Sequence, residues 1–277
     1  MRRCPAMETS TIAVTSGPFR RQNKLVGGTL DTVAIARRNL IDLVRVPQLL
    51  VFTLIQPIIF VIIFRYVFGG AISSVPGVPY VNYLMPGIFV QTVVFGAITT
   101  GVSMATDVKS GLLERFRSLP MSRTGVLAGR TVSDIARSAM AIALIVAVGF
   151  AVGFRVQTNA LLFFAGLLLV LVFSYSLLWV FVTVGLAVGA PESAQAASFP
   201  VIAPLVFASS ALVPVSTMPS WLQGFATYQP VSVTATAVRA LMIGGATASY
   251  VLQSLAWCAS ILIVCIPLSV WLYRRAA

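Results

Sequence analysis

Apolar residues run along this chain in long stretches that are separated by short polar segments. A helix needs roughly 20 apolar residues to cross a hydrocarbon core of about 30 Å, and five stretches reach that length. A sixth is shorter and contains three prolines. The pattern therefore predicts an all-α integral membrane protein with six transmembrane helices. We expect these spans at about 48–68, 83–106, 135–154, 160–189, 199–215 and 250–273.

The polar start of the chain divides into two parts. Residues 1–28 have no apolar core of the kind found in signal peptides, so we expect a disordered cytosolic tail. In residues 29–46, apolar positions recur at helical spacing opposite charged ones. This pattern is typical of an interfacial helix that lies among lipid headgroups. The spans that follow fill the chain to residue 277 and leave no room for a separate soluble domain.

A charged segment, residues 107–130, separates the second and third predicted spans. Within it, a narrow apolar stripe would form on a helix from Leu112, Leu113, Phe116 and Leu119. Pro120 would end that helix, because it has no backbone N–H and disfavours helical geometry at the residue before it. We expect a short amphipathic helix that faces a soluble partner and can transmit the partner's movement into the membrane.

The segment before the last span, residues 209–245, is too polar to span and too apolar for an ordinary loop. Three prolines divide it into short pieces. Trp221, Phe225 and Tyr228 would fit the outer headgroup level. We expect re-entrant helices that dip into the outer leaflet, since irregular backbone is tolerated in lipid only where protein covers it. A plain aromatic anchor at the interface is the overlapping alternative.

Composition and charge agree with a membrane protein and give its orientation. Hydrophobic residues make up 58% of the chain and charged residues 9%, which excludes an ordinary soluble domain. With six spans, sixteen of the 19 Lys and Arg residues lie on the side of the two termini, and the positive-inside rule makes that side cytoplasmic. The net charge of +12 is thus explained by the orientation of the protein in the membrane. It predicts contact with anionic membrane lipids and no nucleic-acid partner.

The sequence also argues against an enzyme. It contains no histidine, and no Asp or Glu lies at a span centre, so we predict no catalytic residues and no metal site. Neither Lys24 nor Lys109 belongs to a G-x-x-x-x-G-K-[ST] phosphate loop. The chain should therefore bind no cofactor and hydrolyse no ATP alone, and any uphill transport must draw energy from another subunit.

Small polar residues follow one face of the second span. Such a stripe commonly mediates close helix packing, as do the G-x-x-x-G patterns at 149–153 and 185–189. A substrate pathway is the alternative, since apolar walls with a few polar groups suit large amphipathic ligands. The candidate pathway residues are Phe89, Thr92, Phe95, Thr99, Ser103, Phe207 and Ser210.

Three motifs resemble those of a known family. They are ERFRSLPMSR at 114–123, LVPVSTMPSWLQGFATYQPVSVTATAVRAL at 212–241 and YLMPGIFV at 83–90. The chain is similar to the ABC-type-2 exporter permeases, specifically the daunorubicin/doxorubicin-resistance group, from about Asp31 onward. The resemblance implies that 29–277 is one transmembrane domain with extracellular re-entrant helices. It also implies an ATPase-coupling helix that contains Leu112, Leu113, Glu114, Arg115, Phe116, Arg117, Ser118, Leu119 and Pro120.

The same resemblance implies partners and a function. Two ABC ATPase subunits would bind ATP and Mg, a second permease, identical or paralogous, would complete a dimer, and the second and fifth spans would line the route. We therefore expect a multi-pass permease subunit of the inner (plasma) membrane, with cytoplasmic termini, that exports a drug or lipid-like cargo by alternating access. Multidrug or antibiotic resistance would follow. The alternatives are a secondary transporter or channel subunit and a non-transporting assembly protein.

Overall fold

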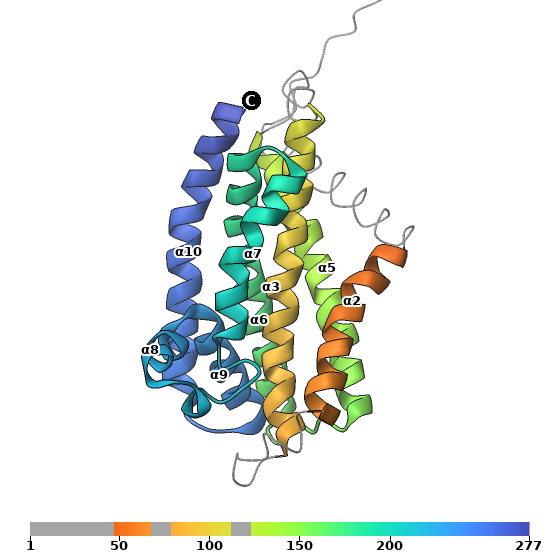
Figure 1. Cartoon of the computed structure of the whole chain (residues 1–277), viewed down its shortest axis with the longest axis vertical. Coiled ribbons are helices and arrows are strands. Elements are labelled where there is room, and N and C mark those ends of the chain that lie inside the picture. The colour runs from red at the N-terminus through yellow and green to blue at the C-terminus, as the bar shows by residue number, and fades with distance from the viewer. Residues whose placement is uncertain (1–46, 68–78, 112–122, 277) are drawn as a thin grey trace, which may run out of the picture.

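A computed structural model describes residues 47–67, 79–111 and 123–276, and every regular element in these ranges is helical (Figure 1). Long helices alternate with short connections, and two short helices precede the last long one. In chain order the elements are α2 (Pro47–Ile62), which continues as the π-helix η1 (Ile63–Val67), α3 (Tyr80–Lys109), α5 (Arg123–Val152), α6 (Ala160–Val188), α7 (Pro191–Phe207), the 3-10 turn η2 (Val215–Thr217), α8 (Ser220–Tyr228), α9 (Pro230–Ile243) and α10 (Thr247–Ala276).

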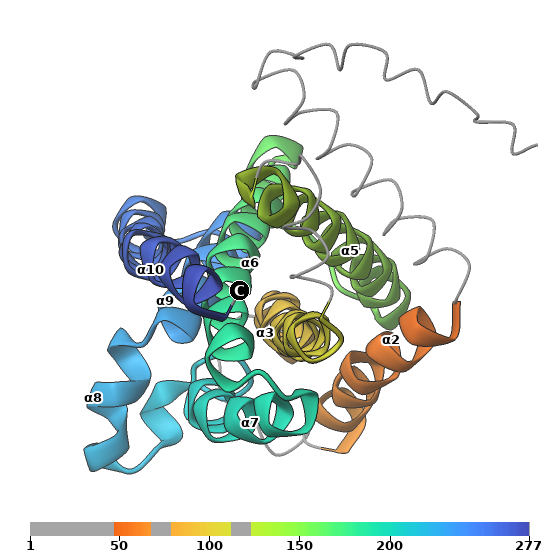
Figure 2. The same cartoon turned by 90° about the horizontal axis from the view of Figure 1, so that it is seen from above.

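Helix α3 occupies the centre of the bundle. It packs against α2, α5, α6, α7 and α9, and Figure 2 shows it enclosed by its neighbours, with α10 on the far side of α6. Its N-terminal half is buried over most of its circumference. Helices α8 and α9 lie at the end of the bundle opposite to the C-terminus (Figure 1). The molecule thus has two distinct ends, one with short helices and one with the ends of α3 and α10.

The described helices agree with an integral membrane protein. Four segments are long and apolar enough to cross a membrane: Tyr80–Lys109, Ser133–Val152, Ala160–Val188 and Thr247–Tyr273. Two shorter apolar segments, Ile55–Val67 and Pro230–Ile243, accompany them. Helix α2 with η1 covers the position of the first predicted span, and α7 overlaps about half of the fifth. The count of six spans remains a prediction.

The fifth predicted span, 199–215, differs from the helix that forms there. Helix α7 begins at Pro191 and ends at Phe207, so it lies eight residues earlier at each end. Pro191 suits the first turn, because its missing N–H has no intrahelical partner at that position. The apolar residues after Phe207 are buried in a non-helical connection instead. Apolarity alone could not distinguish a helix over 199–215 from a helix that ends at Phe207 and continues as a buried non-helical connection.

Glycines allow the closest helix approaches in the bundle. A Cβ at Gly185 of α6 would collide with the carbonyl oxygen of Gly101 of α3. A Cβ at Gly149 would lie 2.5 Å from Cε of Met85. The first glycine of each G-x-x-x-G pattern therefore packs as predicted. The second of each pair has a different role: Gly189 ends α6 with φ 69°, and Gly153, with φ 101°, follows the end of α5.

Several predicted features fall outside the described residues. They are the tail 1–28, the interfacial helix 29–46, and the coupling helix with Leu112, Leu113, Glu114, Arg115, Phe116, Arg117, Ser118, Leu119 and Pro120. Each stays a prediction from the sequence.

Candidate functional site

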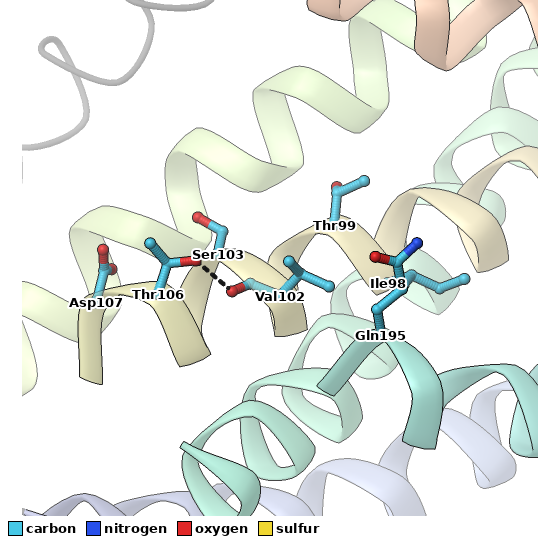
Figure 3. Close-up of a pocket in the computed structure, with 7 residues that line it drawn as sticks. All are labelled: Ile98, Thr99, Val102, Ser103, Thr106, Asp107 and Gln195. Atoms are coloured by element: carbon cyan, nitrogen blue, oxygen red, sulfur yellow. Dashed lines mark hydrogen bonds between the residues drawn. The ribbon is translucent and has the colours of Figure 1, made fainter. Parts of the chain in front are cut away.

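A pocket of about 400 Å³ opens between α3 and α7 near the end of the bundle that carries the C-terminus (Figure 3). Its size falls within the range of small-molecule sites, roughly 300–1,000 Å³. Most of its wall comes from one face of α3, and α7 contributes one amide side chain. The lining residues are Ile98, Thr99, Val102, Ser103, Thr106, Asp107 and Gln195.

The threonine hydroxyls of this wall are bonded within their own helix. Thr99 Oγ1 donates to the carbonyl of Gly96 at 2.7 Å, and Thr106 Oγ1 donates to the carbonyl of Val102 at 2.9 Å. Such local bonds let a hydroxyl lie in a low-dielectric region without a partner from another helix. Together with Ile98 and Val102 they give a mixed surface, apolar with several polar atoms. A surface of this kind can contact an amphipathic molecule.

Two predicted pathway residues, Thr99 and Ser103, line this pocket. Gln195 was missed, because its segment was assigned to the polar loop before the fifth span. Helix α7 instead starts at Pro191 and carries Gln195 on its second turn. Asp107 was counted only as a cytoplasmic charge. The i, i+4 spacing from Ser103 to Asp107 on a helix that runs to Lys109 would have revealed it.

Four other predicted pathway residues lie within the packed subunit, so their place on a transport route stays a prediction. Phe89 is fully buried and contacts Phe154 edge-on, with 6.0 Å between ring centroids. Thr92 is buried and donates to the carbonyl of Ile88 at 2.8 Å. Phe95 packs on Phe60 of α2, and Ser210 is buried beside α9. The cause is the central position of α3, whose N-terminal half is covered on nearly all sides.

The seventh predicted residue, Phe207, has the opposite environment. It ends α7 and is 56% exposed, but it does not line the pocket. In a membrane protein such a side chain contacts either lipid or another subunit.

At the other end of the bundle, polar side chains support the non-helical connection that follows α7, which is called the break after α7 below. The connection from Ala208 to Pro214 is non-helical, so its carbonyls need partners from elsewhere. Gln229 donates to the carbonyl of Ala208, and Tyr80 donates to that of Leu212 at 3.1 Å. The connection therefore carries its own set of side-chain hydrogen bonds.

Arg239 of α9 supplies the central bonds of this set. Its side chain is buried, and Nη2 donates to the carbonyls of Ser210 and Ala211, the latter at 2.8 Å. The hydroxyl of Tyr83 donates to the carbonyl of Ser210 at 3.1 Å as well. The amide of Ser210 donates to Ser232 Oγ at 2.9 Å. Arg239 is one of the three basic residues that the charge count leaves on the side away from the termini, and the structure places its charge inside the protein.

At the end of the bundle that carries the pocket, the polar contact between helices is more exposed than that of Arg239. Lys109, the last residue of α3, lies 3.3 Å from Glu192 in the first turn of α7, and both side chains are largely exposed. An exposed pair of this kind contributes little to stability, of the order of 0–1 kcal/mol. This ion pair therefore adds little to the contact between the two helices that border the pocket.

Comparison with known proteins identifies relatives over most of the chain. The family described as ABC-2 type transporter matches residues 31–243. The daunorubicin resistance ABC transporter permease protein DrrB1 of Streptomyces coeruleorubidus is 36% identical over 231 residues, which cover 83% of this chain and 81% of that protein.

Two mycobacterial proteins are also similar. The probable doxorubicin resistance ABC transporter permease protein DrrC of Mycobacterium tuberculosis is 27% identical over 237 residues, 81% of each chain. The doxorubicin resistance ABC transporter permease protein DrrB of the same organism is 33% identical over 113 residues, which cover 38% of this chain and 39% of that protein.

Proposed function

This chain belongs to the ABC-2 type transporter family, and from that premise we propose that it is the permease subunit of an ATP-driven exporter of hydrophobic or amphipathic cargo. Its relatives are named as permeases of ABC transporters for drug resistance. The permease would provide the route, and separate ATPase subunits, in two copies, would bind ATP and Mg. Alternating access of the route to the two sides of the membrane would move the cargo outward.

The observation that carries this proposal is the pocket between α3 and α7. It is wide enough for part of a drug-sized molecule, and it combines Ile98 and Val102 with the hydroxyls of Thr99 and Ser103. The weak Lys109–Glu192 ion pair would add little resistance to a movement of α7 relative to α3. Cargo would enter here from the cytoplasm or the inner leaflet.

A second permease would close the pocket. The α3 face that carries Thr99, Ser103 and Thr106 is exposed in the single subunit, although it lies on a helix fit to span a membrane. A polar face at membrane depth favours contact with protein or a water-filled cavity over contact with lipid. The two differently named mycobacterial relatives favour a paralogous partner, and an identical one gives the alternative arrangement.

The proposed topology places the pocket end in the cytoplasm. All six spans would cross the inner (plasma) membrane, with both termini inside. Trp221, Phe225 and Tyr228 of α8 are exposed, as expected for aromatic residues at a headgroup level. Helices α8 and α9 would then be the extracellular re-entrant pair. The coupling segment 112–120, next to the pocket end of α3, would face the ATPase.

Co-purification tests this function. The tagged chain, expressed with a candidate ABC ATPase subunit, is expected to recover that ATPase in a complex that hydrolyses ATP. The chain purified alone is expected to show none, because it lacks a phosphate loop. Daunorubicin, the drug named for the Streptomyces relative, serves as the transport probe. Hydrolysis by the chain alone, or daunorubicin export driven by an ion gradient without ATP, would contradict the proposal.

A further inference from the structure

An ion pair lies within α5. Nη2 of Arg137 is 3.3 Å from Oδ1 of Asp134, and the two side chains are only 21% and 13% exposed. Both residues belong to the stretch Ser133–Val152, which is long and apolar enough to cross a membrane. Charged groups so placed are costly and normally face a partner inside the bundle. The other oxygen of Asp134, Oδ2, is buried and accepts no hydrogen bond from the side chains and backbone that the structure describes.

Arg137 joins α5 to the back of the pocket wall on α3. Its Nη2 lies 2.9 Å from Oγ1 of Thr100 and 3.2 Å from the carbonyl oxygen of Gly96. The carbonyl of Gly96 also accepts the hydroxyl of Thr99, which lines the pocket. One carbonyl on α3 therefore connects a charged group of α5 with a side chain that faces the pocket.

The position of Arg137 along the chain suggests how its contact with α3 could transmit movement. The segment 112–122 leads directly into α5, and Arg137 lies about four helical turns beyond Arg123. A continuous helix moves as one rigid element over such a distance. A displacement of the segment that meets the ATPase would therefore reach Arg137 and, through it, Gly96 and Thr99.

We propose that Arg137, held by Asp134, is a positioning residue that passes movement of the coupling segment to the pocket wall of α3. This inference rests on the proposed export function and adds the residue that connects hydrolysis to the pocket. Arginine suits the role, since its planar guanidinium can bond several acceptors in a fixed geometry, whereas lysine offers a single point charge. A hydrophobic residue would pack in the same place without pulling on the carbonyl of Gly96.

The test separates coupling from folding. Arg137→Gln and Arg137→Lys are purified with the ATPase, and three quantities are measured: recovered complex, basal ATP hydrolysis, and daunorubicin moved per ATP hydrolysed in proteoliposomes. For Arg137→Gln we expect recovery and basal hydrolysis close to wild type, with transport per ATP at least about fivefold lower, within the range of ordinary coupling between sites. Arg137→Lys should restore part of that loss. Arg155→Gln, at an exposed arginine near the other end of α5, is the matched control and should match wild type.

Thr100→Val provides an independent variant, because it removes the 2.9 Å acceptor of Arg137 and keeps the side-chain shape. It too should lower transport per ATP without loss of complex. Unchanged transport per ATP in Arg137→Gln or, where that variant fails to assemble, in Thr100→Val overturns the inference and leaves the export function standing. Absence of ATP-dependent transport in the wild-type complex instead contradicts the export function itself, and this inference with it.

Discussion

The guanidinium carbon of Arg239 lies 3.8 Å from the centroid of the Tyr83 ring, and Nε of Arg239 donates to the backbone carbonyl of Tyr83 at 2.8 Å. This contact fixes α9 against the first turns of α3. From there the same guanidinium reaches the carbonyls of Ser210 and Ala211. The break after α7 is therefore stabilised by protein groups, which is the condition for non-helical backbone at membrane depth.

Replacement of Arg239 by Gln should destabilise the protein. The shorter amide cannot reach the carbonyls of Tyr83, Ser210 and Ala211 together, and each buried acceptor left unpaired costs about 1–3 kcal/mol. We expect a clearly lower melting temperature in a thermal unfolding assay of the detergent-purified chain. Arg155→Gln is the control, since that side chain is exposed and only its backbone N–H bonds Asn82. Equal melting of the two variants would show that Arg239 does not support the break.

A second prediction concerns the crossing of α3 and α6. Gly185→Ala places a methyl group against the carbonyl of Gly101, a backbone atom that can move only with its helix. We expect a loss of about 1–3 kcal/mol of stability, typical of overpacking, measured as reduced melting temperature and reduced yield of folded protein. Gly96→Ala on α3 is the matched control, because a Cβ there meets nothing within 4 Å. Wild-type stability of Gly185→Ala would mean that the two helices are not in close contact.

The pocket gives a third prediction. Thr99→Phe fills the space between α3 and α7 and should lower daunorubicin transport by about tenfold, which corresponds to about 1.4 kcal/mol of lost binding. Assembly with the ATPase should persist. Thr227→Phe is the control, since Thr227 is also exposed and bonded within its own helix but lies in α8. If Thr99→Phe instead abolishes assembly and leaves transport by the remaining complex intact, the face serves helix packing.

Topology can be tested by cysteine labelling in a background with Cys4, Cys258 and Cys265 replaced by Ala. Ser193 and Ser216 are both exposed and lie at opposite ends of α7 and its following connection. Ser216→Cys should react with a membrane-impermeant thiol reagent in intact cells, and Ser193→Cys only after the cells are made permeable. Reaction of Ser193→Cys from outside is incompatible with the proposed orientation.

Hydropathy predicted the long helices because a segment that crosses the lipid hydrocarbon must be a long, apolar helix. The fourth predicted span, 160–189, matches α6 within one residue. The rule failed for α7, where protein contacts with Tyr80, Tyr83 and Arg239 allow an apolar segment to be non-helical. Those contacts join residues far apart in the sequence, so no local sequence pattern predicts them.

The candidate site was predictable only in part for the same reason. Helical periodicity placed Thr99 and Ser103 on one face, and both line the pocket. Periodicity could not show that Phe89 and Thr92, nearer the start of the same helix, are covered by neighbouring helices. Arg137 was counted as one more cytoplasmic charge, although it bonds Thr100 across 37 positions in the chain. Which face of a central helix stays open depends on its neighbours.

The most direct test of the central claim is ATP-driven daunorubicin accumulation in inverted membrane vesicles that contain the complex, compared between wild type and Phe116→Ala. Removal of a buried aromatic anchor from an interface typically costs about 2 kcal/mol or more. We therefore predict that wild type accumulates the drug only with ATP, and that Phe116→Ala inserts normally but loses both the ATPase and the transport. Phe225→Ala, at an exposed aromatic of α8, should keep both. Equal ATPase recovery and undiminished transport in Phe116→Ala would contradict a permease driven through this segment.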